Sequence, residues 1–199
     1  MLVKICGIQT VGAAQVAVEA GADLLGFMFA PSKRQISPEK AMQIAATVPS
    51  HVKKVGVFVN ETKETIIHIA KQVGLDVIQL HGDETAEFTN TLPYETIKAF
   101  SIHDAHTETL QSYTCNYYII DSPPTTYRGG SGETFDWNLT TQLNIDPEKF
   151  ILAGGLSANN IEQAIQTVQP TGVDVSSGVE TNGQKDHLKI KQFIAKAKG

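Results

Sequence analysis

The hydrophobic residues of this chain fall into short runs that recur along its whole length. Eight of these runs are rich in Val, Ile, Phe or Tyr and are bounded by Gly, Asp or Ser. Each run is too short for a helix, and a continuous apolar run of this kind is typical of a strand buried on both faces. The predicted strands are residues 3–6, 24–29, 55–59, 77–80, 96–100, 117–120, 150–153 and 173–175.

Segments with a helical period lie between the predicted strands. In four of them apolar residues recur at i, i+3, i+4 and i+7, which predicts helices with one buried face. Ser37 before Pro38 is a typical helix start, and Asn159 with Glu162 resembles a capping box. The four helical segments are residues 41–48, 66–73, 161–168 and 190–197.

The strand-plus-helix unit recurs about every 24 residues without a linker, which predicts a single α/β domain over residues 1–199. The helical period is weak after the fifth strand and in residues 121–144, which carry a loop rich in Pro and Gly. An open doubly wound sheet would place function at one switch point, whereas here polar and Gly residues follow many strands. No GxGxxG follows the first strand. The pattern therefore favours a closed, parallel, eight-stranded (β/α)8 TIM barrel.

Composition excludes several classes of protein. The 199 residues are 41% hydrophobic, which is enough for a full core, and two cysteines are too few for a disulfide scaffold. A net charge of -5 leaves no basic surface for nucleic acid or an anionic membrane. No apolar run approaches the roughly 20 residues of a membrane span, and the start does not resemble a signal peptide. We expect a cytoplasmic protein with no nucleic-acid, membrane or obligate protein partner.

Glycine-rich segments follow the last two predicted strands. Gly154-Gly155 comes after the seventh strand and Ser177-Gly178 after the eighth. Successive backbone N–H groups at a helix start bind phosphate without a cation, and barrels commonly hold phosphate in these two loops. Either segment alone is better explained as a tight turn, but together they predict a phosphate site. The substrate is then a phosphorylated small molecule.

Two groups at strand ends are candidates for proton transfer. Cys6 ends the first strand; its sulfur points into the barrel mouth or, equally well on sequence alone, is a buried apolar thiol. Asp121 follows the sixth strand, where desolvation would favour the neutral carboxyl and suit a proton donor. The competing interpretation is a turn-forming Asp before two prolines. Cys115 precedes the sixth strand at the other end of the barrel and is predicted to be structural.

Three more polar residues are candidates for binding substrate. Asp174 lies inside a strand, so it should point into the barrel and needs partners there. Arg34, in the loop after the second strand, has the planar group that clamps a carboxylate or phosphate, although the residues alone favour a solvated cation. His81 ends the fourth strand and could shuttle protons or donate to substrate, although a lone histidine is more often structural.

Other features predict a cover and no metal. The Gly-rich segment 127–137 is interpreted as a loop that closes over the mouth, anchored by Phe135 and Trp137. His103 and His106 lie beside an aspartate but have no third ligand in view, so we interpret them as a solvated helix start. Neither a metal nor another cofactor is expected.

The ordered set of motifs resembles the phosphoribosylanthranilate isomerase family of tryptophan biosynthesis. The resemblance implies an Amadori rearrangement of an aminoaldose to an aminoketose, without cofactor or metal. The matching stretches are KICGI (4–8), GF (26–27), SKR (32–34), VGVFVN (55–60), QLHGDE (79–84), GGSG (129–132), TFDW (134–137), LAGGL (152–156), DVSSGVE (174–180) and KD (185–186).

The resemblance also implies roles for single residues. Asp121 is then the general acid that protonates the furanose ring oxygen, and Cys6 is the general base that removes the C2′ proton. A thiolate has a pKa near enough to neutrality for this task. Arg34 is similarly placed to meet the anthranilate carboxylate. The backbones of Gly154, Gly155, Ser177 and Gly178 are placed to hold the phosphate.

Two alternative functions remain at this point. A lyase that resembles indole-glycerol-phosphate synthase would need a Lys acid at a strand end with a carboxylate partner. Lys98 is the mid-strand candidate for that acid, and no Glu is expected to match it. A non-catalytic barrel that binds phosphosugars would keep the glycine-rich loops but would have no use for Cys6 and Asp121 together.

Overall fold

The computed structural model describes residues 1–123, 134–143 and 145–199. In this part of the chain eight parallel strands pair in sequence order, and β8 pairs with β1 to close a barrel. The predicted (β/α)8 barrel is confirmed. The strands are β1 (Leu2–Cys6), β2 (Leu24–Met28), β3 (Lys53–Phe58), β4 (Val77–Leu80), β5 (Glu95–Ser101), β6 (Tyr117–Asp121), β7 (Phe150–Leu152) and β8 (Gly172–Val175).

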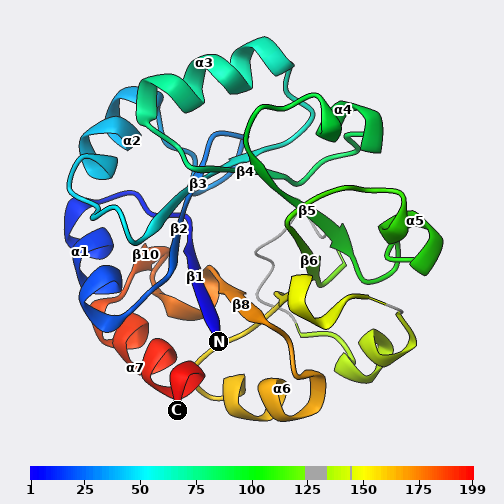
Figure 1. Cartoon of the computed structure of the whole chain (residues 1–199). Helices are drawn as coiled ribbons and strands as arrows, with labels where there is room; N and C mark the ends of the chain where they lie inside the picture. Colours follow the sequence, from blue (N-terminus) through cyan, green and yellow to red (C-terminus); the bar gives the residue numbers. More distant parts are fainter. Residues whose placement is uncertain (124–133, 144) are drawn as a thin grey trace.

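Helices surround the barrel (Figure 1). A short hairpin follows β8 and is built from β9 (Glu180–Thr181) and β10 (Gln184–Lys185). The α-helices are α1 (Val11–Ala20), α2 (Pro38–Ala45), α3 (Lys63–Val73), α4 (Ala86–Asn90), α5 (Thr107–Gln111), α6 (Ile161–Val168) and α7 (His187–Lys198). The 3-10 helices are η1 (Trp137–Gln142), η2 (Pro147–Lys149) and η3 (Ser177–Val179).

All eight strands lie within about two residues of their predicted bounds, which is the usual scatter of element ends. The helix-start prediction at Ser37 is confirmed, because its side chain accepts a hydrogen bond from the N–H of Lys40 with Pro38 at the first turn. The capping box at Asn159 is wrong. The cap position is Asn160, whose side chain instead accepts from the N–H of Ser157.

The two stretches with a weak helical period form only short elements of the helix layer. After β5 the chain forms only α5, and between β6 and β7 the described residues form the 3-10 helices η1 and η2. Phe135 and Trp137 pack, partly buried, against the core, as predicted for the anchors of a cover. The rest of that predicted cover, residues 127–133, lies outside the described residues.

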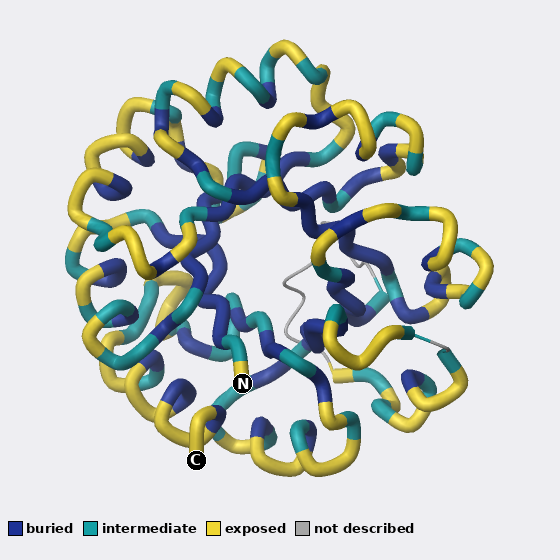
Figure 2. The backbone as a smooth tube through the Cα atoms, viewed as in Figure 1, coloured by how far each residue is buried: buried dark blue, intermediate teal, exposed yellow. Residues whose placement is uncertain are grey.

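Alternation along the strands divides the core into two layers. Successive side chains of a strand point to opposite faces, so every second residue faces the barrel interior and the others face the helices. Figure 2 shows the buried positions concentrated on the strands and on the inner sides of the helices. The apolar interior cluster consists of Leu24, Val55, Val77, Ile97, Ala99, Ile119, Ile151 and Ala153.

Polar side chains take over the interior positions near the carboxyl ends of four strands. The outer layer contains Val3 and Ile5 of β1 and Val173 and Val175 of β8, so Lys4, Cys6 and Asp174 face inward. This alternation places a group of ionisable side chains above an apolar floor. None of the helices in the described ranges is both long and apolar enough to cross a membrane.

Candidate active site

Asp121 is the last residue of β6 and faces the barrel interior, as does Ile119 two residues earlier. The carboxylate accepts hydrogen bonds from the N–H (2.8 Å) and the hydroxyl (3.3 Å) of Ser122. Burial, helped by the negative charge of Asp174, raises the pKa of Asp121 to about 6, although Ser122 and Lys4 act in the opposite direction. A carboxyl that keeps its proton close to neutral pH is suited to act as an acid.

Cys6 is the last residue of β1, and its sulfur lies inside the barrel among charged groups. A Cβ atom at Gly26, the neighbouring position on β2, would lie 2.8 Å from this sulfur, so only glycine leaves room for it. Burial raises the pKa of the thiol, and the nearby cations Lys4 and Lys185 offset part of that effect. The raised pKa of the Cys6 thiol differs from the expected value near neutrality, because a thiolate loses most of its hydration inside the barrel.

Lys4 and Asp174 form an ion pair across the seam that closes the barrel. They are register partners on β1 and β8, with Lys4 Nζ 2.9 Å from Asp174 Oδ1. The prediction that Asp174 points inward and finds a partner is confirmed. Sequence reasoning missed Lys4, although a lysine between the apolar residues Val3 and Ile5 was a usable signal, since a fully buried charge needs a partner.

Arg34 is part of a second charged network, on the β8 side of the mouth. Its Nε and Nη2 atoms donate to the two carboxylate oxygens of Glu180, at 2.7 and 2.9 Å. The solvated cation favoured by the residues alone is wrong, because the Arg34 side chain is 16% exposed. The β9–β10 hairpin returns Lys185 to the same carboxylate at 2.6 Å and to the carbonyl of Ser176 at 2.8 Å. Sequence reasoning missed both Glu180 and Lys185.

The glycine-rich segments after β7 and β8 meet beside the two aspartates. Gly154 and Gly155 have φ values of 87° and 60°, a left-handed conformation that favours glycine. Together with Ser177 they line a small cavity of about 30 Å³ that Asp121 and Asp174 also border.

Backbone N–H groups in these two segments are available to a ligand. Within the described residues, no acceptor is hydrogen-bonded to the N–H groups of Gly155, Ser177 or Gly178. Gly178 does not line the small cavity itself, but it packs so closely on the other segment that a Cβ there would overlap the carbonyl oxygen of Leu156. The two loops predicted to hold phosphate are therefore in direct contact.

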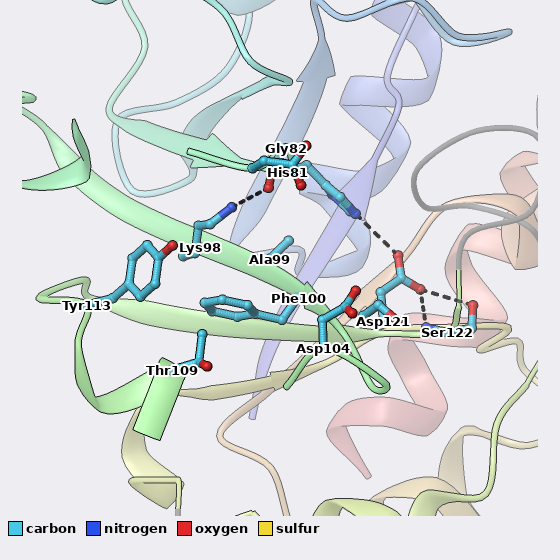
Figure 3. Close-up of a pocket in the computed structure, with 12 residues that line it drawn as sticks. His81, Gly82, Lys98, Ala99, Phe100, Asp104, Thr109, Tyr113, Asp121 and Ser122 are labelled. Atoms are coloured by element: carbon cyan, nitrogen blue, oxygen red, sulfur yellow. Dashed lines mark hydrogen bonds and ion pairs between the residues drawn. The ribbon is translucent and has the colours of Figure 1, made fainter. Parts of the chain in front are cut away.

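His81 lies on the other side of Asp121, at the edge of a larger cavity of about 340 Å³. Figure 3 shows the imidazole of His81 directed at the carboxylate of Asp121, with Phe100 and Tyr113 farther along the same cavity. His81 Nε2 is 3.8 Å from Asp121 Oδ2, and His81 Nδ1 is 3.1 Å from the side-chain nitrogen of Gln79. His81 is thus not the lone histidine that favoured a structural interpretation.

Comparison with known proteins decides the family. A sequence model described as N-(5′-phosphoribosyl)anthranilate isomerase matches residues 3–196. The chain belongs to this family. An N-(5′-phosphoribosyl)anthranilate isomerase from Bacillus mycoides (strain KBAB4) is 52% identical over 200 residues, which cover 100% of this chain and 98% of the relative.

Solved structures agree with this assignment over the full length of the barrel. The phosphoribosyl anthranilate isomerase of Thermus thermophilus has a TM-score of 0.89 and 33% identity, with 98% of each chain covered. A phosphoribosyl anthranilate isomerase in complex with reduced 1-(o-carboxyphenylamino)-1-deoxyribulose 5-phosphate has a TM-score of 0.83 and 38% identity, with 100% of each chain covered. The family resemblance drawn from the motifs is confirmed, and the chain is an isomerase.

The expectation that no Glu would match Lys98, which weighed against the lyase alternative, is wrong. Lys98 does have a matching acid: its Nζ lies 3.0 Å from Glu84 Oε2 and 2.7 Å from the carbonyl oxygen of Gly82. The loop after β4 folds back over β5, which sequence spacing did not reveal. Because Ile97 and Ala99 face the interior, Lys98 faces outward. The family assignment, and not the lack of a partner for Lys98, excludes the lyase.

The remaining predicted features lie outside the mouth. His106 occupies the cap position of α5 without a side-chain cap, and both His103 and His106 are exposed, as expected of a solvated helix start. No group of three or more His, Cys, Asp or Glu among the described residues is arranged to hold a metal ion. Cys115 is a buried free cysteine just before β6, at the opposite end from Cys6.

Proposed function

We propose that this chain converts N-(5′-phosphoribosyl)anthranilate to 1-(2-carboxyphenylamino)-1-deoxyribulose 5-phosphate in tryptophan biosynthesis, with Asp121 as general acid and Cys6 as general base. The observation that carries the assignment is the meeting of these two groups in one barrel mouth. They come from β1 and β6 and face the same interior, and Asp121 borders the glycine-rich segments that follow β7 and β8. A phosphorylated substrate with its phosphate on those N–H groups extends its sugar toward both side chains.

The reaction requires one proton donor and one proton acceptor. Asp121 gives its proton to the furanose ring oxygen, the C1′–O bond breaks, and the nitrogen lone pair forms a C1′=N Schiff base. The thiolate of Cys6 then removes the C2′ proton, and the electrons of that bond form C1′=C2′ and neutralise the nitrogen. The resulting enolamine takes a proton at C1′ and loses the proton of the C2′ hydroxyl. The substrate gains two protons and loses two, so the product has the same atoms and electrons, and no external oxidant or reductant is required.

In the free site, Cys6 and Asp121 mainly have the opposite protonation states to those that react. With a raised thiol pKa and an Asp121 pKa of about 6, the neutral-pH site holds mainly the thiol and the carboxylate. The reactive form, with thiolate and carboxylic acid, carries the same number of protons. Its share of the population is therefore constant at every pH between the two pKa values. The rate between the two pKa values is then set by this constant share of reactive sites.

Three side chains are proposed to position the substrate. Glu180 holds one edge of the Arg34 guanidinium through Nε and Nη2, which leaves Nη1 for the anthranilate carboxylate. His81 borders the cavity beside Asp121, where it is placed to contact the sugar. Asp174 borders the phosphate cavity but is paired with Lys4, so its role includes orienting that lysine.

The phosphorylated small-molecule substrate follows from the family. The cytoplasmic location and the lack of nucleic-acid, membrane and obligate protein partners stay predictions from composition. We assign no cofactor to the reaction, because the proposed steps transfer only protons and the substrate neither gains nor loses electrons overall.

Substitution of the two reacting groups tests the proposal. Cys6→Ser and Asp121→Asn should each lower kcat by at least about 100-fold, the usual contribution of a general acid or base. Fluorescence decay of phosphoribosylanthranilate measures turnover, and a reduced product analogue measures binding, which should persist. Cys115→Ala and Asp76→Asn are matched controls, because these residues lie at the opposite end of the barrel.

Two results would contradict the proposal. Near-normal turnover in Cys6→Ser or Asp121→Asn would remove that residue from the mechanism. Binding of the product analogue without any turnover by the unmodified chain would favour the non-catalytic phosphosugar-binding barrel.

A further inference from the structure

Lys4 is a buried cation near Cys6 that has no role in the proposed proton transfers. Its side chain has 0% exposure, inside the barrel and two residues before the proposed base. We infer that Lys4 is a positioning residue of the isomerisation, whose buried ammonium lies beside the Cys6 sulfur and stabilises the thiolate form that removes the C2′ proton. This inference rests on the proposed role of Cys6 as general base.

The geometry brings the ammonium to the sulfur. Lys4 and Cys6 are alternate residues of β1, so both side chains project from the same inward face. The neighbouring strand carries Gly26, and a Cβ there would lie 2.8 Å from the sulfur and 3.3 Å from the Lys4 nitrogen. The two atoms therefore flank one point in space, which is left open because Gly26 has no side chain.

Charged groups from four elements around the barrel act on Cys6. Arg34 and Lys185 share the single carboxylate of Glu180, so these three groups keep one net positive charge. Lys4 pairs with one oxygen of Asp174, and its positive charge also lowers the pKa of the thiol. Among these cations Lys4 lowers the pKa of the thiol most, and its side chain is the one that the barrel buries completely.

The Lys4–Asp174 pair has opposite effects on the two reacting groups. Lys4 lowers the pKa of Cys6, which favours the thiolate, and Asp174 raises the pKa of Asp121, which favours the carboxylic acid. These are the two charge states that the reaction needs. One ion pair, oriented with its cation toward β1, therefore raises the share of the reactive protonation state.

A purely structural role does not account for this arrangement. β1 and β8 already pair through the four register positions from Leu2 to Ile5, so closure of the barrel does not depend on one side-chain contact. A buried ion pair adds little stability compared with well-packed apolar residues of similar size. A Leu or Met at position 4 would fill the interior, whereas it would leave the sulfur of Cys6 without the cation beside it.

Titration of the Cys6 thiol provides a test that does not require turnover. The ultraviolet absorbance of the thiolate is measured against pH, and the same variant carrying Cys6→Ser is subtracted. In Lys4→Met the thiol pKa should rise by at least about one unit, and kcat should fall at least about tenfold with little change in KM. Lys4→Arg, which keeps the charge, should recover part of both.

Two further variants separate electrostatics from loosened packing. Asp174→Asn removes the anion that raises the thiol pKa, so the Cys6 titration should move in the opposite direction, to lower pH. Lys54→Met is the matched control, because Lys54 is a strand lysine with an ion pair of the same length, 2.9 Å to Asp76. The thiol titration should not change in that control.

The results distinguish failure of this inference from failure of the proposed function. An unchanged thiol titration in Lys4→Met, or shifts of the same sign in Lys4→Met and Asp174→Asn, would overturn the role of Lys4 even if the unmodified chain turns over normally. If Lys4→Met does not fold, Lys4→Arg and Asp174→Asn decide, and an unmoved titration in both overturns the role. If the unmodified chain does not isomerise the substrate, the proposed function fails together with the catalytic part of this inference.

Discussion

Two buried lysines in this barrel make the same kind of ion pair with different consequences. Lys4 on β1 and Lys98 on β5 each place their nitrogen about as far from a carboxylate, at 2.9 and 3.0 Å. Lys4 points into the barrel and lies beside the Cys6 thiol. Lys98 points outward, where it also binds the carbonyl of Gly82 and lies over the ring of Phe100 at 5.4 Å.

The difference shows that the direction of a strand residue decides what its charge does. Around Lys98 the partners are a backbone carbonyl, a carboxylate and aromatic rings, and Glu84 also accepts from the N–H groups of Asn60 and Gly82. That pair fastens the loop after β4 to β5. Around Lys4 the neighbours titrate, so its charge changes their proton affinity. Shifting a strand residue by one position exchanges these two environments.

The largest expected effect on stability is in the outer pair. Lys98→Met should lower the free energy of unfolding by about 3–5 kcal/mol, because it leaves Glu84 charged and buried without its cation. Urea denaturation followed by circular dichroism measures this loss. The Cys6 thiol titration of the folded variant should match the unmodified chain, which sharpens the contrast with Lys4→Met.

Lys54→Met is the control for Lys98→Met, since Asp76 is 33% exposed and stays hydrated when its partner is removed. A loss below about 1 kcal/mol in Lys98→Met, the range of exposed pairs, would contradict a fastening role for this ion pair. A shifted pKa of the Cys6 thiol in Lys98→Met would contradict the difference drawn between Lys4 and Lys98.

The second expected effect is a gain in the free energy of unfolding, and it concerns Asp121 in the barrel interior. Asp121 has a pKa of about 6 in the folded chain, above that of an unfolded Asp, so the folded state binds this proton more tightly. Its ionisation destabilises the fold as the pH rises from about 4 through 6. Asp121→Asn should therefore be more stable than the unmodified chain by up to about 3 kcal/mol at pH 8.

This gain should decrease as the pH falls through 6 and vanish below about pH 3, where the carboxyl is protonated in both states. Urea denaturation at a series of pH values measures it. Equal stability of the two chains at pH 8 would mean that the interior does not raise the pKa of Asp121.

The smallest effect is in the pH dependence of kcat/KM. The reactive form carries a thiolate and a carboxylic acid, so its population is constant between the pKa of Asp121 and that of Cys6. Below pH 6 the activity should fall about tenfold per pH unit, since the thiolate is lost while the acid is already saturated. Activity that rises on acidification below pH 6 would contradict this reverse protonation.

Sequence patterns predicted the fold well because the signal of a buried strand is local. A continuous apolar run needs no knowledge of its neighbours, and all eight runs became strands of the barrel. The predictions that were wrong concerned contacts between loops. The capping box at Asn159 failed because the Asn160 side chain reaches back to Ser157, and the solvated Arg34 failed because Glu180 lies across the mouth.

Sequence alone determined which residues are buried in strands and which chemical groups end them, including Cys6 and Asp121, because hydrophobic period and residue type are properties of short segments. Only the tertiary structure decided which charges meet. Lys4 and Asp174 are 170 residues apart in the chain, and they become neighbours only because β8 closes on β1. Electrostatic coupling depends on distance and burial in space, and neither can be read from separation along the chain.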